Sequence, residues 1–209
     1  MYDFKAIGEA LIACDEERVI NLVQRGLSQG VPAKDLLNQG LIVGMDLVGE
    51  RMEKEEMFIP EVLMAAKAMS SAVGILKPQL AEGDVGVKGR VVIGTVKGDL
   101  HDIGKNLVAM MLESAGLEVH NLGVDIAPEK FAEAVKATGA NVLALSALLT
   151  TTMPMMKETI GALTKAGIRD KVKIIVGGAP VNQAFADQIG ADGFAADAGS
   201  ASRLAKSMI

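Results

Sequence analysis

The 209-residue chain has few aromatic residues, little positive charge and almost no cysteine. It has no Trp, one Tyr and five Phe, too few rings for a protein that stacks the bases of single-stranded nucleic acid. Its formal net charge of −5 lacks the basic surface typical of nucleic-acid binding. Because Cys14 is the only cysteine, no disulfide can form within the chain.

The chain also shows no basic, apolar leader, and no uninterrupted apolar run approaches the roughly 18 residues of a membrane span. These absences predict a soluble, cytoplasmic protein with neither a membrane nor a nucleic acid as partner. What the chain does have is 50% apolar residues, with 23 Gly and 12 Met. Its core must therefore be built from Ala, Val, Ile, Leu and Met.

Charge divides the chain unevenly. Residues 1–86 carry 8 Lys and Arg against 14 Asp and Glu, a net charge of −6, whereas residues 87–209 carry 13 against 12, a net charge of +1. The sequence pattern changes at the same place. We therefore predict a domain over residues 1–86 and a second over residues 87–209, with the glycines from Gly83 to Gly89 as a hinge.

The first domain has only helical patterns. Apolar residues recur at helical spacing in three runs, which begin after Asp15, at Pro32 and at Pro60. Gly30 marks the end of the first run, and Pro78 ends or kinks the last one. About four helices in this length of chain predict a small four-helix bundle.

The second domain alternates short apolar strands with helical stretches. Strands are predicted over residues 90–96, 118–122, 141–146, 173–177 and 193–195. Helices are predicted near residues 104–115, 128–138, 153–166, 181–189 and 200–207. This alternation predicts an α/β fold, a flavodoxin/Rossmann-like sheet of five parallel strands with helices on both faces. Such sheets bind ligands at the carboxyl ends of their strands.

The loop after the first strand superficially resembles a nucleotide-binding loop. Gly98, Gly104 and Lys105 imitate the GxxxxGK[ST] pattern, but five residues rather than four separate the two glycines. Asn106 also stands where the magnesium-binding hydroxyl should be. The sequence therefore argues against nucleotide triphosphate binding.

The same loop contains Asp99 and His101, two residues apart. In an extended loop their side chains point the same way, so the carboxylate can bond one imidazole nitrogen while the other faces a metal. His101 and His120 are the only histidines, too few for a zinc site without cysteines. A single His suits a metal that brings its other ligands in a macrocycle. The alternative is a His that does no more than bond Asp99, and spacing alone does not decide between the two.

The loops after the third and fourth strands carry hydroxyls and glycines. The hydroxyls can cap the helix that begins around Met153, bond a polar ligand tail or support Asp99 and His101. The glycine pair permits the close approach of a ligand. The residues are Ser146, Thr150, Thr151 and Thr152 in one loop, and Gly177 and Gly178 in the other.

Together these motifs resemble the cobalamin-binding domain family, whose signature is Asp-x-His-x-x-Gly, Ser-x-Leu and Gly-Gly. The resemblance covers roughly residues 88–209, and residues 57–69 resemble the helical cap that precedes this domain in cobalamin-dependent methyltransferases such as methionine synthase. Without a catalytic barrel, the chain is similar to the free-standing corrinoid proteins of methanol and methylamine methyltransferase systems. The matching residues are Asp99, His101, Gly104, Ser146, Leu148, Gly177 and Gly178.

The resemblance implies a cobalamin or related corrinoid cofactor, with His101 displacing the lower base and binding cobalt. Asp99 would support His101, and Thr152 would complete this ligand triad. Ser146 and Thr150 would bond the nucleotide tail. Further cofactor contacts would come from Gly98, Leu100, Asp102, Ile103, Gly104, Leu148, Gly177, Gly178 and Ala198. From the cap, Met52 and Ile59 would cover the methyl face, with Met52 where an aromatic ring is familiar.

The implied function is that of a methyl carrier subunit rather than a complete enzyme. Its cob(I) state would accept a methyl group from a substrate-specific methyltransferase, and methyl-cob(III) would deliver it to a second one. The cap would move to allow this, and a reductive activation protein is a further possible partner. The donor stays open among methanol, methylamines, methoxyarenes and quaternary amines.

The alternative function is a cobalamin-dependent sensor or regulator. Such a protein usually carries a DNA-binding helical unit, and the acidic residues 1–86 argue against one. A phosphoacceptor receiver or flavin domain could share the sheet, but a receiver needs Asp where Ser146 stands. A mutase subunit would share the cobalamin loop without the cap segment around Pro60.

Overall fold

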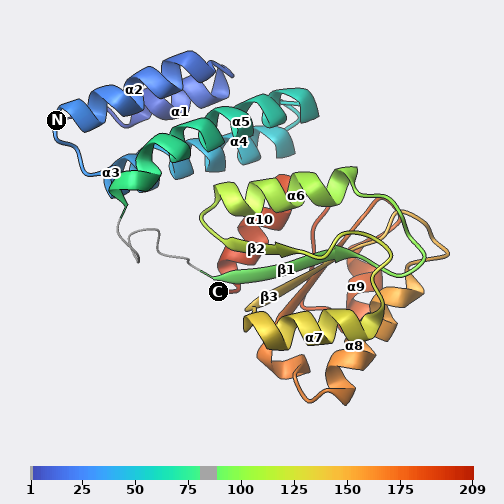
Figure 1. Ribbon diagram of the computed structural model, residues 1–209. Helices are drawn as coiled ribbons and strands as arrows, with labels where there is room; N and C mark the ends of the chain where they lie inside the picture. The colour runs from blue at the N-terminus through green and yellow to red at the C-terminus, as the bar shows by residue number, and fades with distance from the viewer. Residues whose placement is uncertain (1, 81–88) are drawn as a thin grey trace. The chain divides into compact units, whose positions relative to one another are not determined.

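The computed structural model describes residues 2–80 and 89–209 (Figure 1). The chain divides into two compact units: among the described residues, the first comprises residues 2–80 and is grouped with Ser114–Gly116, and the second comprises the rest of residues 89–209. The predicted boundary after residue 86 lies outside the described residues, as does the predicted hinge apart from Gly89. The two units are therefore described separately.

The helical unit contains four helical stretches within residues 2–80, as the sequence predicts. They are α1 (Lys5–Ile12), α2 (Glu16–Ser28), the continuous α3 (Ala33–Asp35), η1 (Leu36–Ile42) and α4 (Val43–Glu53), and α5 (Ile59–Leu76). The Asp15 carboxylate caps α2 by accepting from the Arg18 amide at 3.0 Å, and Gly30 follows this helix with a φ of +77°. Pro78 lies in the 3-10 turn η2 (Lys77–Gln79), where α5 has already ended.

The middle of the third stretch, η1, is a π-helix, which the apolar pattern did not reveal. Helix α1 packs closely along this stretch at two glycines. A Cβ on Gly40 would lie 2.7 Å from Ile7 Cδ1, and one on Gly44 would lie 2.8 Å from the Gly8 Cα. Gly44 therefore needs glycine because of helix packing, whereas a side chain at Gly40 would require the end of the Ile7 side chain to shift.

Helix α5 is the most apolar element of the unit. By length and composition the segment Ile59–Gln79 could cross a membrane, which the prediction of no membrane-spanning run did not anticipate. Several of its apolar residues pack inside the bundle, where Val62, Ala65 and Met69 are buried. On the same helix Lys67 pairs with Glu16 of α2 at 2.8 Å. Packing within the unit accounts for part of the apolar composition, and the cytoplasmic location stays a prediction.

The second unit is built on a parallel sheet of five strands in the order β2-β1-β3-β4-β5, the flavodoxin-like order. This confirms the predicted fold class. Each strand begins within one residue of its predicted start. The strands are β1 (Arg90–Thr95), β2 (Glu118–Asn121), β3 (Val142–Ser146), β4 (Lys173–Gly177) and β5 (Gly193–Phe194).

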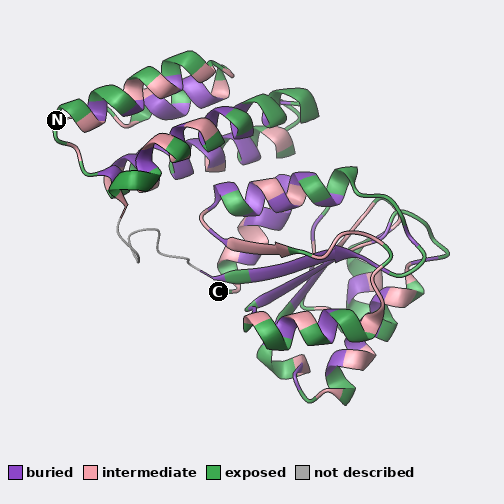
Figure 2. Ribbon diagram, viewed as in Figure 1, coloured by how far each residue is buried: buried purple, intermediate pink, exposed green. Residues whose placement is uncertain are grey.

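Helices cover both faces of this sheet, as predicted (Figure 1). Alternate residues of β1 serve the two faces: Val91 and Ile93 pack towards α6 and α10, whereas Val92 packs towards α7, α8 and α9. Figure 2 shows β1 as almost continuously buried, whereas the edge strand β2 is of intermediate burial. The helices are α6 (Ile103–Ser114), α7 (Pro128–Thr138), α8 (Pro154–Lys165), α9 (Gln183–Ile189) and α10 (Ala198–Ser207), with the turn η3 (Arg169–Lys171) before β4.

Candidate functional site

The predicted site residues meet at the carboxyl ends of the three central strands. In the sheet register, Thr95 of β1 is paired with Ser146 of β3, and Ser146 is paired with Gly177 of β4. The loops that follow these three strands therefore leave the sheet at one edge. This is the position at which open parallel sheets bind ligands.

Asp99 is the polar centre of this edge and is completely buried. Its Oδ1 accepts from the His101 amide at 3.1 Å and lies 2.7 Å from His101 Nδ1. Its Oδ2 accepts from Thr152 Oγ1 at 2.7 Å, and from the amides of Leu148 and Leu149 at 2.8 and 3.3 Å. A buried carboxylate with this many donors is fully satisfied.

The hydrogen bonds also determine the charge of Asp99. Burial on its own would raise the pKa of this carboxyl, but donors from Thr152, His101 and the Leu148 amide hold the pKa well below its usual range. Asp99 is therefore ionised, and it fixes which imidazole nitrogen of His101 carries a proton. With Nδ1 bonded to the carboxylate, Nε2 is the nitrogen available to a ligand.

His101 itself is half exposed, with 51% of its side chain accessible. The predicted contact between Asp99 and His101 is thus present, and the open ring is placed to meet a ligand from outside. Among residues 2–80 and 89–209, no group of three or more His, Cys, Asp or Glu side chains could hold a metal ion. The donor set accordingly fits a metal that arrives with its own equatorial ligands.

The surroundings of His101 fit a flat, largely apolar ligand. Large apolar side chains are exposed on both loops that meet at Asp99, where a monomeric protein would normally bury them. Asp102 accepts from the Asn106 side chain at 3.0 Å, beside the start of α6. The exposed side chains are Leu100 and Ile103 in the first loop, at 72% and 76%, and Leu148 and Leu149 in the second, both at 42%.

The structure confirms one of the predicted roles for the hydroxyls after β3, support of Asp99, and shows that the predicted helix cap is wrong. No side-chain hydroxyl caps α8, whose N-cap residue is Met153. Pro154 begins the helix and has no amide hydrogen to satisfy there, so the need for a cap is smaller. Thr152 instead donates to Asp99. Ser146 is half buried and Thr150 is exposed, which leaves both able to reach a ligand.

Contacts within the protein explain the two glycines at the end of β4, Gly177 and Gly178. A Cβ on Gly178, whose φ is +132°, would lie 1.9 Å from the Ala147 carbonyl oxygen, and one on Gly177 would lie 2.9 Å from the Ala195 oxygen. The close approach is therefore made by this chain's own backbone. Room for a ligand beside these glycines stays a prediction, as does a contact with Ala198, which is buried at the start of α10.

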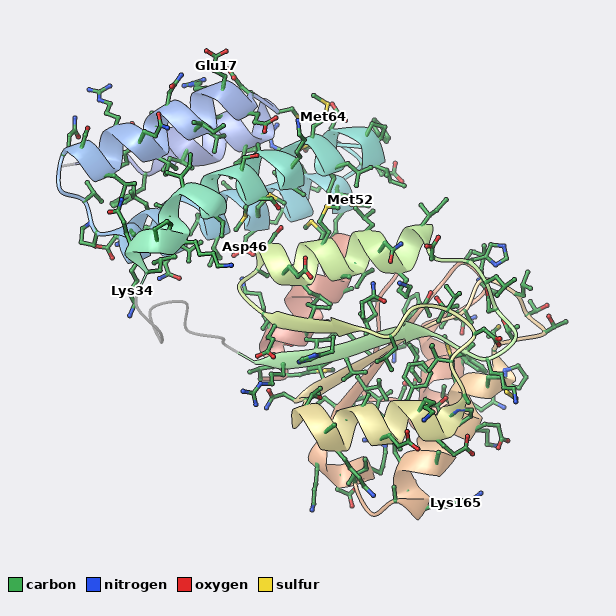
Figure 3. The ribbon with its side chains drawn as sticks, viewed as in Figure 1. Glu17, Lys34, Asp46, Met52, Met64 and Lys165 are labelled. Carbon is green, nitrogen blue, oxygen red and sulfur yellow. The ribbon has the colours of Figure 1, made fainter. Side chains whose placement is uncertain are left out.

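Two predicted residues belong to the helical unit. Met52 lies near the end of α4 and is half buried, and Ile59 begins α5 with 45% exposure (Figure 3). Met64, also on α5, is 54% exposed. Exposed apolar side chains at the start of α5 are suited to covering an apolar ligand or partner, but this role of Met52 and Ile59 stays a prediction.

Sequence reasoning missed two residues that hold the His101 loop. Thr95, at the end of β1, donates from Oγ1 to the His101 carbonyl oxygen at 2.8 Å. Asp125, at a φ of +55°, accepts from the Gly98 amide at 2.7 Å and donates from its own amide to the Asp99 carbonyl oxygen at 3.0 Å. The sequence offered one signal, for Thr95 alone: it is a hydroxyl residue at the end of a mostly apolar predicted strand.

Comparison with known proteins agrees with this geometry. Models of a B12 binding domain match residues 89–204 and residues 4–77. The dimethylamine corrinoid protein of Methanosarcina barkeri is 44% identical over 204 residues, which cover 97% of this chain and 95% of that protein. The crystal structure of a cobalamin-binding protein from Desulfitobacterium hafniense DCB-2 covers 100% of both chains at 32% identity, with a TM-score of 0.87.

The third similar protein is part of a crystallised complex. The crystal structure of the methanol:cobalamin methyltransferase complex MtaBC from Methanosarcina barkeri matches with a TM-score of 0.84 and 33% identity, over 98% of this chain and 78% of that one. Fold and site together define a cobalamin-binding protein. The chain belongs to the B12-binding family of corrinoid proteins found in methylamine and methanol methyltransferase systems. The resemblance inferred from the sequence motifs is confirmed.

Proposed function

We propose that this protein is the methyl carrier of a corrinoid-dependent methyltransferase system. The observation that carries the proposal is the chain of hydrogen bonds from Thr152 through Asp99 to His101 Nδ1, which leaves Nε2 on a half-exposed ring. A bound corrinoid supplies a cobalt centre that can accept a methyl group and release it again. The protein's task is to hold that centre, tune it and control access to it.

In this proposal His101 would hold cobalt through Nε2, in place of the cofactor's own base. Asp99 holds the ring in the tautomer that exposes Nε2 and makes the imidazole a stronger donor. Thr152 and the amides of Leu148 and Leu149 keep Asp99 ionised and fixed. Leu100 and Ile103 are exposed and would offer apolar surface to the corrin ring.

The displaced tail would lie along the loops after β3 and β4. Ser146 and Thr150 supply hydroxyls to bond it, and the segment of Gly177 and Gly178 presents little side-chain bulk. Ala198 lies at the start of α10, near the far end of this path. Gly98 and Gly104 flank the His101 loop, and Asp102 within it offers polar contacts to the amide groups around the ring.

The helical unit would act as a cap, with Met52 and Ile59 over the methyl face. A covered methyl group is protected from side reactions but cannot be transferred, so partner binding must displace the cap. The partners are a substrate-specific methyltransferase and a second methyltransferase that serves the acceptor, with a reductive activation protein as a third. Similarity to a protein named for dimethylamine makes dimethylamine the first donor to test.

Cobalt ligation is tested with the two histidines of the chain. We expect His101→Ala to retain less corrinoid and to change the visible spectrum of the methylated protein. His120→Ala, which removes the other histidine, is the control and should leave the spectrum as in wild type. An unchanged spectrum in His101→Ala would contradict the ligation.

Methyl transfer is tested separately. The reduced, corrinoid-loaded protein is mixed with the methyltransferase that co-purifies with it and with a panel of donors that includes dimethylamine, methanol and methoxyarenes. Absorbance should report methylation with one class of donor. Failure with every class would contradict the carrier function.

A further inference from the structure

Thr95 is a buried residue with a hydroxyl group. Neither the sequence motifs nor the proposed function assigns it a role. It ends β1, has no exposed surface and lies between β2 and β3 in the sheet. Its Oγ1 donates to the His101 carbonyl oxygen at 2.8 Å, across the five residues of the intervening loop. A valine would fill the same space in an apolar strand, so the hydroxyl needs a reason.

The backbone of Thr95 is itself firmly held. Its amide donates to the Gly123 carbonyl oxygen at 3.0 Å, and its carbonyl oxygen accepts from the Ile126 amide at 3.1 Å. Beside it, the Val96 amide donates to the Ser146 carbonyl oxygen at 3.0 Å. Thr95 is therefore a fixed point of the sheet from which a hydrogen bond can position a mobile neighbour.

His101 lies in a stretch of the loop without regular structure. Its amide donates to Asp99 Oδ1 at 3.1 Å, and its carbonyl oxygen is the group that accepts from Thr95. Both polar backbone groups of His101 are thus held, one by Asp99 and one by Thr95. Asp99 fixes the tautomer and direction of the ring, whereas Thr95 fixes the peptide from which the ring extends.

We propose that Thr95 is a positioning residue for His101, one that holds the His101 peptide at the height at which Nε2 reaches cobalt. This inference rests on the proposed ligation by His101. Without the Thr95 hydroxyl, the peptide after His101 can rotate while Asp99 still bonds Nδ1. The ligated arrangement then becomes one of several accessible to the loop, and ligation weakens.

The test compares matched variants. Thr95→Val removes the hydroxyl and keeps the shape, and Thr95→Ser restores the hydroxyl. Thr159→Val is the control, because Thr159 is also fully buried and its Oγ1 also donates to a backbone carbonyl oxygen at 2.8 Å, that of Met155 in α8. Thr95→Ala, with a smaller side chain, replaces Thr95→Val should the latter not fold.

The first readout is amide hydrogen exchange over residues 97–104 in the cofactor-free protein. Thr95→Val should speed exchange of the His101 amide by roughly 2–13-fold, the ratio that corresponds to one net hydrogen bond. Thr95→Ser and Thr159→Val should exchange there as wild type does. Equal exchange in Thr95→Val and Thr159→Val would overturn the proposal.

The second readout is the visible spectrum of the methylated, corrinoid-loaded protein, with His101→Ala as the unligated reference. Thr95→Val should move the ligation equilibrium towards that reference by roughly 2–13-fold, and Thr95→Ser should reverse most of the change. A wild-type spectrum in Thr95→Val would overturn the proposal. A wild-type protein whose own spectrum matches His101→Ala would contradict the ligation instead, and the exchange readout would then decide whether Thr95 holds the loop.

Discussion

Asp99 is the residue on which the geometry of the site depends. It is completely buried, and it joins the loop after β1 to the loop after β3 through hydrogen bonds to His101, Leu148 and Thr152. A charged side chain is seldom buried without such partners, because desolvation of an unpaired carboxylate costs several kcal/mol. Each donor to Asp99 therefore contributes to folding as well as to the orientation of His101.

Thr152→Val tests this contribution. The variant keeps the side-chain shape but removes one donor to a buried charge, so the free energy of unfolding should fall by about 1.5–3 kcal/mol. Denaturant unfolding of the cofactor-free protein measures the change. The neighbouring Thr151 is exposed, and Thr151→Val should leave stability within about 0.5 kcal/mol of wild type. Equal stabilities of the two variants would contradict the role given to Thr152.

The pairing of Asp99 with His101 could be predicted from sequence because it is local, with one residue separating the partners. Residue pattern alone could not predict the other donors to Asp99, because the Leu148 amide and the Thr152 hydroxyl come from a loop some fifty residues further along the chain. The family resemblance nevertheless placed Thr152 with Asp99 and His101. Residue type identified Thr152 only as one of several hydroxyls. An amide donor carries no sequence signal, since almost every residue has one.

At the scale of elements, the strand-to-loop junctions position the site. Strand starts were predictable because buried parallel strands are continuous apolar runs bounded by turn residues. The π-helical stretch η1 was not, because its residues share the apolar pattern of an ordinary helix. The two glycines after β4 were read as space for a ligand, whereas their contacts show that they also admit the backbones of neighbouring loops.

Gly178→Ala tests the junction after β4. The new Cβ would lie 1.9 Å from the Ala147 oxygen at a φ that other residues rarely adopt, so the free energy of unfolding should fall by about 3 kcal/mol or more. Gly161→Ala in α8 is the control, because nothing lies within 4 Å of its Cβ position. That variant should be stabilised by up to about 1 kcal/mol. A Gly178→Ala protein as stable as wild type would rule out the close approach.

Gly44→Ala tests the packing of α1 on α4. Its Cβ would lie 2.8 Å from the Gly8 Cα, so the two helices must separate, at a cost of about 1–3 kcal/mol. Gly74→Ala in α5, whose Cβ position has nothing within 4 Å, should instead stabilise the protein slightly. Thermal unfolding followed by circular dichroism distinguishes the two, and equal midpoints would contradict the close packing.

At the scale of the whole molecule, the two units have different tasks in the proposed function. The α/β unit contains His101, Asp99 and Thr152 and would bind the cofactor, whereas the acidic helical unit would cover it. The change in charge and pattern predicts two domains, and their boundary after residue 86, outside the described residues, stays a prediction. Charge and pattern carry no information on how the cap responds to a partner.

The cap is tested with a double variant, Met52→Ala with Ile59→Ala. It should retain corrinoid as wild type does, because the cofactor is held by the other unit, but its reduced cofactor should be oxidised several-fold faster. Met64→Ala removes another exposed apolar side chain of α5 and should have no such effect. Absorbance after exposure to a limited amount of oxygen measures the rate. Equal oxidation rates in all three proteins would argue against a cover formed by Met52 and Ile59.

The carrier function is tested most directly by following one methyl group through the protein. Reduced, corrinoid-loaded protein is given isotope-labelled dimethylamine and the co-purifying methyltransferase, separated from both, and then mixed with the second methyltransferase and its acceptor. The account predicts about one label per bound corrinoid on the isolated protein, and its transfer to the acceptor in the second step. A protein that holds its corrinoid yet carries no label after the first step, with any donor of the panel, would contradict the carrier function.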